Sequence, residues 1–315
     1  MNLYEDLTLR TDLADEKEEI LKESTGEKLS GIIVNKKKIK GFDVTLMNVI
    51  NSEGEDATGK PIGRYVTIDV GKIWMSDKKR FSDACEVISH YIKEFVPYDG
   101  SCMLAALGNK SIIADAIGPL TAENFIVTRH IKDSDEEMFR AMCLRETLCI
   151  SPGVLGNTGM EAAKIIKGAV LQSNPSFIIA VDSLASRKLS RLATTVQICD
   201  TGITPGSGIN NARKEISSKT LGVPVIAIGV PTVVDVTTLA SDIIRNIVSR
   251  SENGNIKSYA GKIINEISSN EAENFFVTPK ETDHIIKDTS KLIGYSINMA
   301  LHEGITEAEI DELVF

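Results

Sequence analysis

The chain has 315 residues, a hydrophobic content of 42% and a formal net charge of -9 at pH 7. This length and composition suit one large or two ordinary globular domains with a substantial core. The acidic balance argues against a nucleic-acid groove, and no apolar run approaches the ~18 residues of a membrane span. The N-terminus lacks the basic and apolar regions of a secretory signal, so we expect a cytoplasmic protein that binds neither membrane nor nucleic acid.

The first 29 residues are polar and acidic, and 15–19 read as an exposed helix or a mobile arm. Such a charged stretch has little reason to be buried. Two β-rich segments follow, 31–34 and 42–47, around the basic turn 36–40. They predict a β-hairpin with a solvated turn, and the alternating segment 63–70 predicts another strand.

A helical pattern over 81–96 precedes an apolar run, 102–107, that predicts a buried strand. Gly108 and Asn109 break the run, and Asp115 then lies among apolar neighbours. A carboxylate in such surroundings is costly unless it is paired, hydrogen-bonded or protonated. Asp115 is therefore either the N-cap of a following helix, expected over 120–130, or part of a site.

A second apolar run, 177–181, predicts another buried strand and ends on Asp182. Two parallel strands would thus each deliver an aspartate near a carboxyl end, the edge at which open α/β sheets bind ligands. Between them lies a glycine-rich loop, 151–159, whose backbone a ligand can approach closely. The loop lacks the lysine of a phosphate-binding Walker loop.

The strand predicted over 194–199 leads into Asp200-Thr-Gly202, the triplet of pepsin-like proteases. Those enzymes are all-β, whereas this chain alternates strands with helices. Asp200 is interpreted as a turn residue or a structural carboxylate near the site, with Gly206, Ser207 and Gly208 as further possible neighbours of the site.

The C-terminal third predicts a strand over 223–229, a helix over 237–249 and a polar surface excursion over 250–275. A last long helix is expected from Thr278, as its N-cap, to about residue 302. No internal repeat or linker is visible. The sequence therefore predicts one α/β domain with a parallel or mixed sheet flanked by helices.

Metal and nucleophile sites find little support in the sequence. The chain has only four histidines, no zinc-ligand spacing, and five cysteines without a Cys-x-x-Cys pair, so buried free thiols are expected. A pair of strand-end aspartates remains. If the two carboxyls lie close together, one keeps a proton while the other stays ionised. Such a pair can activate a water and protonate a leaving amine, which is peptide hydrolysis.

Nearly the whole chain resembles the germination protease family of spore-forming Firmicutes. The motifs that carry this resemblance are Arg10-Thr-Asp-Leu-Ala14, Gly63-Arg-Tyr-Val-Thr67, Leu107-Gly-Asn109, Asp115-Ala-Ile-Gly-Pro119, Thr128-Arg-His130, Pro152-Gly-Val154, Ile178-Ile-Ala-Val-Asp182, Asp200-Thr-Gly-Ile203, Pro205-Gly-Ser-Gly208, Arg213-Lys-Glu-Ile-Ser217, the run from Gly222 to Asp235, and Val277-Thr-Pro-Lys-Glu281.

The resemblance implies an endopeptidase, without cofactor or metal, that degrades small acid-soluble spore proteins in the spore core at germination. It implies a fold similar to hydrogenase maturation endopeptidases with an extra N-terminal hairpin, and assembly as a homotetramer. The family's two essential aspartates fall on Asp115 and Asp182.

The resemblance also implies a zymogen that processes itself. We expect cleavage between Leu13 and Ala14, which separates a pro-segment, 1–13, from a single peptidase domain, 14–315. Acidification should favour this step, by loosening the acidic arm or by bringing the aspartate pair to its single-proton state.

Two other classes stay open at this point. One is a metal-dependent maturation-type peptidase of the same fold, and the other is a non-catalytic peptide-binding protein. Sensitivity to a chelator separates the first from the aspartate mechanism, and a cleavage assay separates the second.

Overall fold

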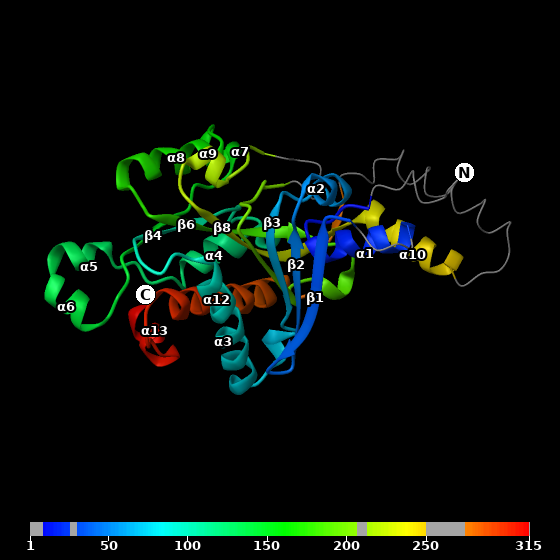
Figure 1. The fold of residues 1–315 in the computed structure, drawn as a ribbon. Helices are drawn as coiled ribbons and strands as arrows, with labels where there is room; N and C mark the ends of the chain where they lie inside the picture. Colours follow the sequence, from blue (N-terminus) through cyan, green and yellow to red (C-terminus); the bar gives the residue numbers. More distant parts are fainter. Residues whose placement is uncertain (1–8, 26–29, 207–212, 250–274, 315) are drawn as a thin grey trace.

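The computed structural model of the chain describes residues 9–25, 30–206, 213–249 and 275–314. A central β-sheet lies between two layers of helices (Figure 1). The strands of the described part are β1 (Ile32–Ile39), β2 (Phe42–Val49), β3 (Gly63–Asp69), β4 (Cys102–Ala106), β5 (Thr147–Ile150), β6 (Phe177–Ala185), β7 (Thr195–Cys199), β8 (Val225–Asp235) and β9 (Phe276–Val277).

Its helices are α1 (Ala14–Thr25), α2 (Ser52–Thr58), α3 (Lys78–Phe95), α4 (Ile117–Ala122), α5 (Arg129–Ser134), α6 (Glu136–Ala141), α7 (Leu155–Thr158), α8 (Ala162–Ser173), α9 (Ser218–Leu221), α10 (Val236–Ser249), α12 (Thr282–Leu301) and α13 (Glu307–Leu313). Short 3-10 turns lie at Ile73–Met75, Ile113–Asp115 and Leu189–Arg191. None of the described helices is long and apolar enough to cross a membrane.

The sheet is mixed, as predicted. Its strand order is β1-β2-β3-β7-β8-β6-β4-β5, with β9 paired to β8. Strands β5, β4, β6 and β8 pair in parallel, whereas β1, β2, β3, β7 and β8 pair antiparallel. The parallel strands β4 and β6 are buried almost throughout, which is why their sequences are continuous apolar runs.

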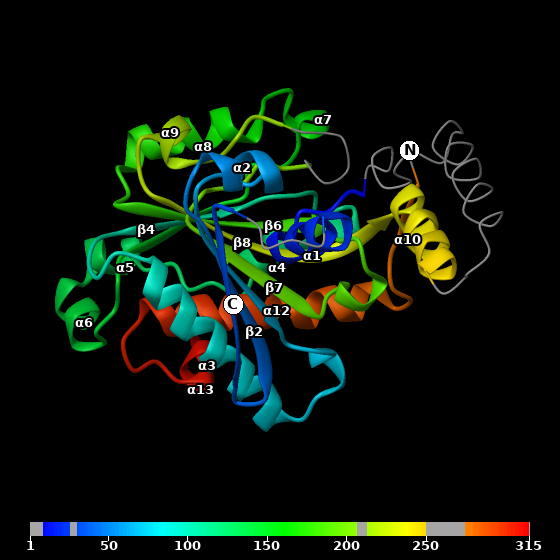
Figure 2. The ribbon, with the colours of Figure 1, turned by 45° about the vertical axis from the view of Figure 1, so that its right-hand side comes forward.

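The two faces of the sheet carry separate cores. Helices α3, α4 and α12 cover one face, and α8 and α9 cover part of the other (Figure 2). On the first face Tyr91 of α3 and Ile293 of α12 are fully buried. On the second, Ile166 of α8 packs against the parallel strands, and α1 covers the antiparallel strands nearby. Burial of both faces leaves the strand ends as the place for a site.

The predicted hairpin is β1 and β2. The two strands pair from Ile32 opposite Val49 to Ile39 opposite Phe42, and Lys40 and Gly41 form the turn with positive φ angles. Phe42 is fully buried while the lysines of β1 are exposed, so one face of the hairpin anchors it to the core.

The helix expected over 120–130 is wrong. Helix α4 ends at Ala122, and α5 starts only at Arg129, so His130 lies in a first turn instead of a last one. The segment between them takes its hydrogen bonds from elsewhere. The backbone N–H of Ile126 donates to the Asn298 side chain, and that of Thr128 donates to the Thr147 hydroxyl. These distant partners outweigh local helix propensity.

Two boundaries in the C-terminal third also differ. Strand β8 runs on through Pro231 to Asp235, where the sequence suggested only a lead into a helix. Helix α12 has Glu281 as its N-cap, three residues after the expected Thr278. The predicted surface excursion over 250–275 lies outside the described residues except for its last one.

The expectation that the N-terminal arm is exposed is wrong for the part that the structure describes. Leu13 and Ala14 are both 0% exposed, at the start of α1. Ala14 packs against Met47, Tyr65 and Cys199 on the antiparallel half of the sheet. Sheet residues far away in sequence thus bury a segment whose own composition is polar.

Candidate active site

Asp182 lies inside β6, because this strand continues to Ala185 beyond the end predicted from sequence. Its side chain is 4% exposed, and one carboxylate oxygen accepts a hydrogen bond from the backbone N–H of Ser183. Burial raises the pKa of Asp182 well above its ordinary value, and the negative charges of Asp115 and Asp12 raise it further. Asp182 is therefore a carboxyl whose surroundings favour its protonated form.

Asp115 closes the 3-10 turn that follows β4. The backbone N–H of Asn109 donates both to its main-chain oxygen and to its carboxylate Oδ2, each at 2.9 Å. Gly108 makes this loop possible, because its φ is +109° and a side chain there would meet the Asp115 carbonyl. The N-cap of α4 is Ala116, so the capping role considered for Asp115 is wrong. Burial raises the pKa of Asp115 to about 6.

The two aspartates line one cavity of 560 Å³ at the carboxyl end of the parallel strands. Its walls are largely apolar, from Leu107, Ile112 and Leu184, with Gly153 of the glycine-rich loop and Gly206 at the rim. The cavity therefore combines apolar surface for substrate side chains with a pair of carboxyls whose pKa values are both raised.

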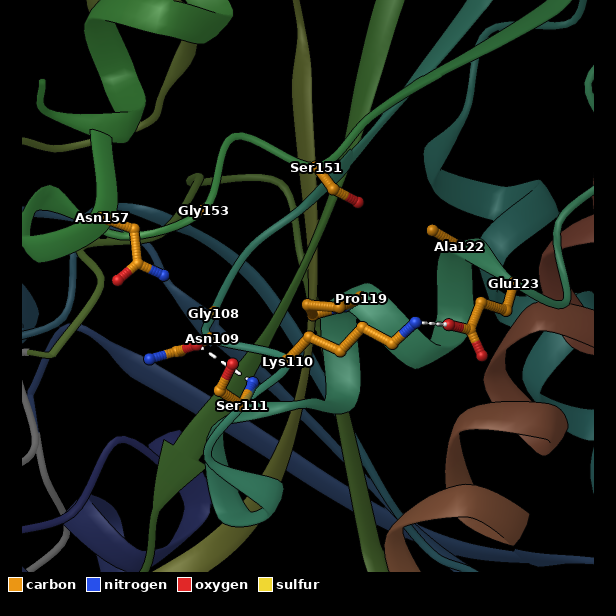
Figure 3. Close-up of a pocket in the computed structure, with 10 residues that line it drawn as sticks. All are labelled: Gly108, Asn109, Lys110, Ser111, Pro119, Ala122, Glu123, Ser151, Gly153 and Asn157. Atoms are coloured by element: carbon orange, nitrogen blue, oxygen red, sulfur yellow. Dashed lines mark hydrogen bonds and ion pairs between the residues drawn. The ribbon is translucent and has the colours of Figure 1, made fainter.

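A smaller cavity of 460 Å³ adjoins the first and shares Gly108, Asn109 and Gly153 with it. Its lining mixes apolar surface, such as that of Pro119 and Ala122, with polar side chains (Figure 3). Lys110 forms a 2.5 Å ion pair with Glu123, and the backbone N–H of Ser111 donates to the Asn109 side chain. The two cavities meet at the loop that holds Gly108 and Asn109, and together they offer a longer surface to a peptide than either one alone.

Asp200 is a structural carboxylate. It accepts hydrogen bonds from the backbone N–H and the Nε of Arg64 and lines neither cavity described above. This agrees with its interpretation as a turn residue and not as a member of a pepsin-like pair. Of its predicted companions, Gly206 lines the aspartate cavity, while Ser207 and Gly208 lie outside the described residues.

The N-terminal segment 9–14 reaches the aspartate cavity, which Asp12 helps to line. Asp12 pairs with the end of β6. Its N–H donates to the Ala185 carbonyl, and its Oδ2 accepts from the Ala185 N–H, both at 2.9 Å. Its own carbonyl oxygen accepts from Lys60 Nζ at 2.7 Å and from Gln197 Nε2 at 3.2 Å. Sequence reasoning missed Asp12 as part of the cavity lining, and Lys60 and Gln197 as partners of its carbonyl.

The N-terminal segment continues into α1, whose first turn also carries buried carboxylates. Glu16 accepts the backbone N–H groups of Arg187 and Lys188 and the hydroxyl of Thr11. Burial raises the pKa of Glu16 and also that of Asp15, although Arg191 pairs with Asp15. For these two carboxyls acid favours the buried arrangement, which is the opposite of the loosening that the sequence suggested, whereas the lowered pKa of Glu19 beside Lys188 acts in the other sense.

Within the described ranges, no group of three or more His, Cys, Asp or Glu side chains is placed to hold a metal ion. All five cysteines are free thiols. Cys85, Cys102 and Cys199 are buried, Cys149 is partly buried, and Cys143 is exposed.

Residues 9–255 match the sequence profile of the Peptidase_A25 family, described as germination protease. The chain is 40% identical to the germination protease of Caldanaerobacter subterraneus over 98% of both chains. It is 38% identical to that of Clostridium perfringens over 97% of this chain and 99% of the relative. It is 36% identical to that of Bacillus pumilus over 95% of both chains.

Proposed function

The chain belongs to the germination protease family, and on that premise we propose that it starts the degradation of small acid-soluble spore proteins in the spore core during germination. The observation that carries this proposal is the placement of Asp115 and Asp182 in one cavity, where burial raises the pKa of both carboxyls and the charge of Asp115 raises that of Asp182 further. Membership of the family supports protease activity, and the aspartate pair is proposed to carry out the hydrolysis.

The surroundings of the two carboxyls assign the roles. Asp115, whose pKa is about 6, is the base that takes a proton from a bound water. The more deeply buried Asp182, whose pKa is raised by burial and by the charge of Asp115, is the acid in the same cavity. The water oxygen bonds to the peptide carbonyl carbon. Asp182 then gives its proton to the leaving nitrogen as the C–N bond breaks, which leaves a new carboxyl and a new amine. No covalent enzyme intermediate is needed.

The protein is also proposed to be a zymogen that processes itself near Leu13 and Ala14, the expected cleavage site. The docking of Asp12 in the aspartate cavity supports this, because a segment that lies there both blocks the site and presents its own peptide bonds. Release of about the first 13 residues would then open the cavity to spore proteins.

Assembly as a homotetramer is part of the same proposal. Helix α10 leaves Ile243 and Ile247 more than half exposed, and exposed apolar side chains of this kind suit a contact between copies of the chain. Sedimentation velocity on the full chain, before and after processing, tests this part alone.

The decisive experiment uses the purified full chain and a small acid-soluble spore protein. After incubation at several pH values between 5 and 7, which span the pKa of Asp115, N-terminal sequencing should show loss of the pro-segment, and the processed protein should cleave the spore protein. The variant Asp182→Asn should do neither. A wild-type protein that cleaves the spore protein while Met1 is still its N-terminus would contradict the zymogen but not the protease.

A further inference from the structure

We propose that Lys60 and Gln197 form the binding site for the carbonyl oxygen of the peptide bond that is cleaved. This inference rests on the proposed function, since it assigns two further groups to the same reaction. Both donate to one oxygen, the Asp12 carbonyl, from elements far apart in sequence. Two donors on a single carbonyl are the arrangement that stabilises the oxyanion of acyl transfer.

Each donor is fixed in place by its own element. Lys60 follows the left-handed C-cap Gly59 of α2, and its backbone N–H donates to the Thr58 hydroxyl. Gln197 is 7% exposed in the middle of β7, between β3 and β8. A preorganised donor of this kind needs no rearrangement during the reaction, which is the source of its effect on rate.

The sheet places Gln197 and Asp182 in one row. In the strand register Gln197 pairs with Gly229 of β8, and Gly229 pairs with Asp182 of β6. Side chains in register point to the same face, so the two residues flank a glycine at a main-chain separation of ~10 Å, two strand spacings. The Leu184 side chain lies over Gly229 between them, since an added Cβ there would lie 2.4 Å from Leu184 Cδ1. The N-terminal segment itself pairs with β6 at Ala185, three residues beyond Asp182, and its Asp12 carbonyl reaches Gln197 from there.

The contacts select the bond between Asp12 and Leu13, one residue before the bond expected from sequence. The Leu13 carbonyl already accepts the Lys17 N–H in the first turn of α1, so it is used by the helix. The side-chain amide of Gln197 also accepts the Ala14 N–H at 2.7 Å, so it binds the backbone on both sides of Leu13. The Asp12 carbonyl is the one that receives side-chain donors from outside the segment.

In the reaction, water attacks the carbonyl carbon of residue 12, and the C=O electron pair moves to the oxygen that Lys60 and Gln197 bind. The carbonyl re-forms as the C–N bond breaks, and the amine of residue 13 leaves with the proton from Asp182. The two donors change neither charge nor protonation. Since negative charge on the oxygen exists only near the transition state, they should raise kcat and leave KM nearly unchanged.

The experiment compares Lys60→Met and Gln197→Met with wild type in the full chain, with Lys60→Arg as a variant that keeps a donor. Lys22→Met removes a charge on α1, and Thr67→Val alters the residue of β3 that pairs with Gln197, so these two are matched controls.

The first measurement is the rate of self-processing by mass spectrometry. The second is hydrogen exchange of the Asp12 amide in an Asp182→Asn background, which reports docking of the segment. The third is kcat and KM for a spore protein after prolonged processing.

We expect Lys60→Met and Gln197→Met each to slow processing and to lower kcat by about 100-fold, as removal of one oxyanion donor does. Lys60→Arg should recover part of the rate, the new N-terminus should be Leu13, and exchange of the Asp12 amide should not change. Wild-type rates in both variants, or a rate loss that follows loss of Asp12 protection, would overturn the carbonyl assignment alone. A wild-type N-terminus at Ala14 would also overturn it, whereas an unprocessed wild type would contradict the proposed self-processing.

Discussion

Asn109 binds Asp115 twice with a single N–H group, once at the main-chain oxygen and once at the carboxylate. The first contact closes the loop, and the second orients the carboxyl within it. A hydrogen bond to the ionised form lowers the pKa of Asp115, but the larger effect of burial raises it to about 6. The result is a carboxyl that is ionised at neutral pH and still basic enough to take a proton from water.

The substitutions Asp115→Asn and Asp182→Asn should each lower cleavage of a spore protein by about 10³-fold or more, because a lone carboxyl cannot serve as both base and acid. Near-ultraviolet circular dichroism should show that both variants fold. Asp200→Asn is the matched control, since its ion pair with the half-exposed Arg64 lies outside the cavity. If Asp200→Asn alone abolished activity, the pepsin-like interpretation would be the better one.

Cleavage by the processed protein should decline as the pH falls through about 6, because protonation of Asp115 removes the base. Stability should change in the other direction. The folded-state pKa lies above the ordinary value, so the contribution of Asp115 to stability is fully present at low pH and is lost as the pH rises through about 6. The pH profile of kcat/KM and urea unfolding at several pH values measure the two effects. An acid limb at pH 4 or below would contradict the assignment of Asp115 as base.

Docking of the N-terminal segment should weaken as the pH rises, because burial raises the pKa of Asp15 and of Glu16. Glu19, whose pKa is lowered beside Lys188, acts in the opposite sense. Hydrogen exchange of the Asp12 amide in Asp182→Asn protein, followed against pH, reports the docking. Glu16→Gln should flatten this pH dependence, and an unchanged slope in that variant would exclude Glu16 as its source.

Gly118→Ala should destabilise the protein by about 1–3 kcal/mol and lower kcat, because a methyl group there meets backbone on two sides. An added Cβ would lie 2.1 Å from the Leu107 carbonyl oxygen and 2.7 Å from that of Val181, the residue before Asp182. Gly168→Ala in α8 is the control. Nothing lies within 4 Å of its added Cβ, so stability should rise by about 0.5–1 kcal/mol. Equal unfolding midpoints for the two variants would contradict the packing argument.

Dialysis of the processed protein against a strong chelator should leave its activity unchanged, and serine- or cysteine-directed reagents should also fail to inhibit it. This prediction rests on the metal-ligating groups of the site, because no third ligand accompanies Asp115 and Asp182 among the described residues. Activity that is lost on chelation and restored by one particular metal would favour the maturation-type peptidase.

The buried strands and both aspartates could be predicted because their signals are local. Strands β4 and β6 are continuous apolar runs, and Asp115 and Asp182 are carboxyls placed directly among such residues. The hairpin followed from two alternating segments around a basic turn. None of these predictions depends on which residues, distant in sequence, pack against the segment.

The predictions that were wrong concern features that depend on residues distant in sequence. Burial of Leu13 and Ala14 depends on β7, whose Gln197 is 183 residues from Ala14 and receives its N–H. The break between α4 and α5 depends on Asn298, 172 residues from the Ile126 amide that it binds. Lys60 and Gln197 carry no motif, so only the fold shows that they meet at one oxygen.

The lysines of β1 have a consequence for how copies of this chain can meet. Strand β1 is the end strand of the sheet, and Lys36, Lys37 and Lys38 line its exposed edge. Charged edge strands repel a second edge, so the sheet is protected against growing from one molecule into the next. Ordered contacts at this end of the sheet must therefore come from helices or loops, whereas β5, which forms the other end, carries no lysine.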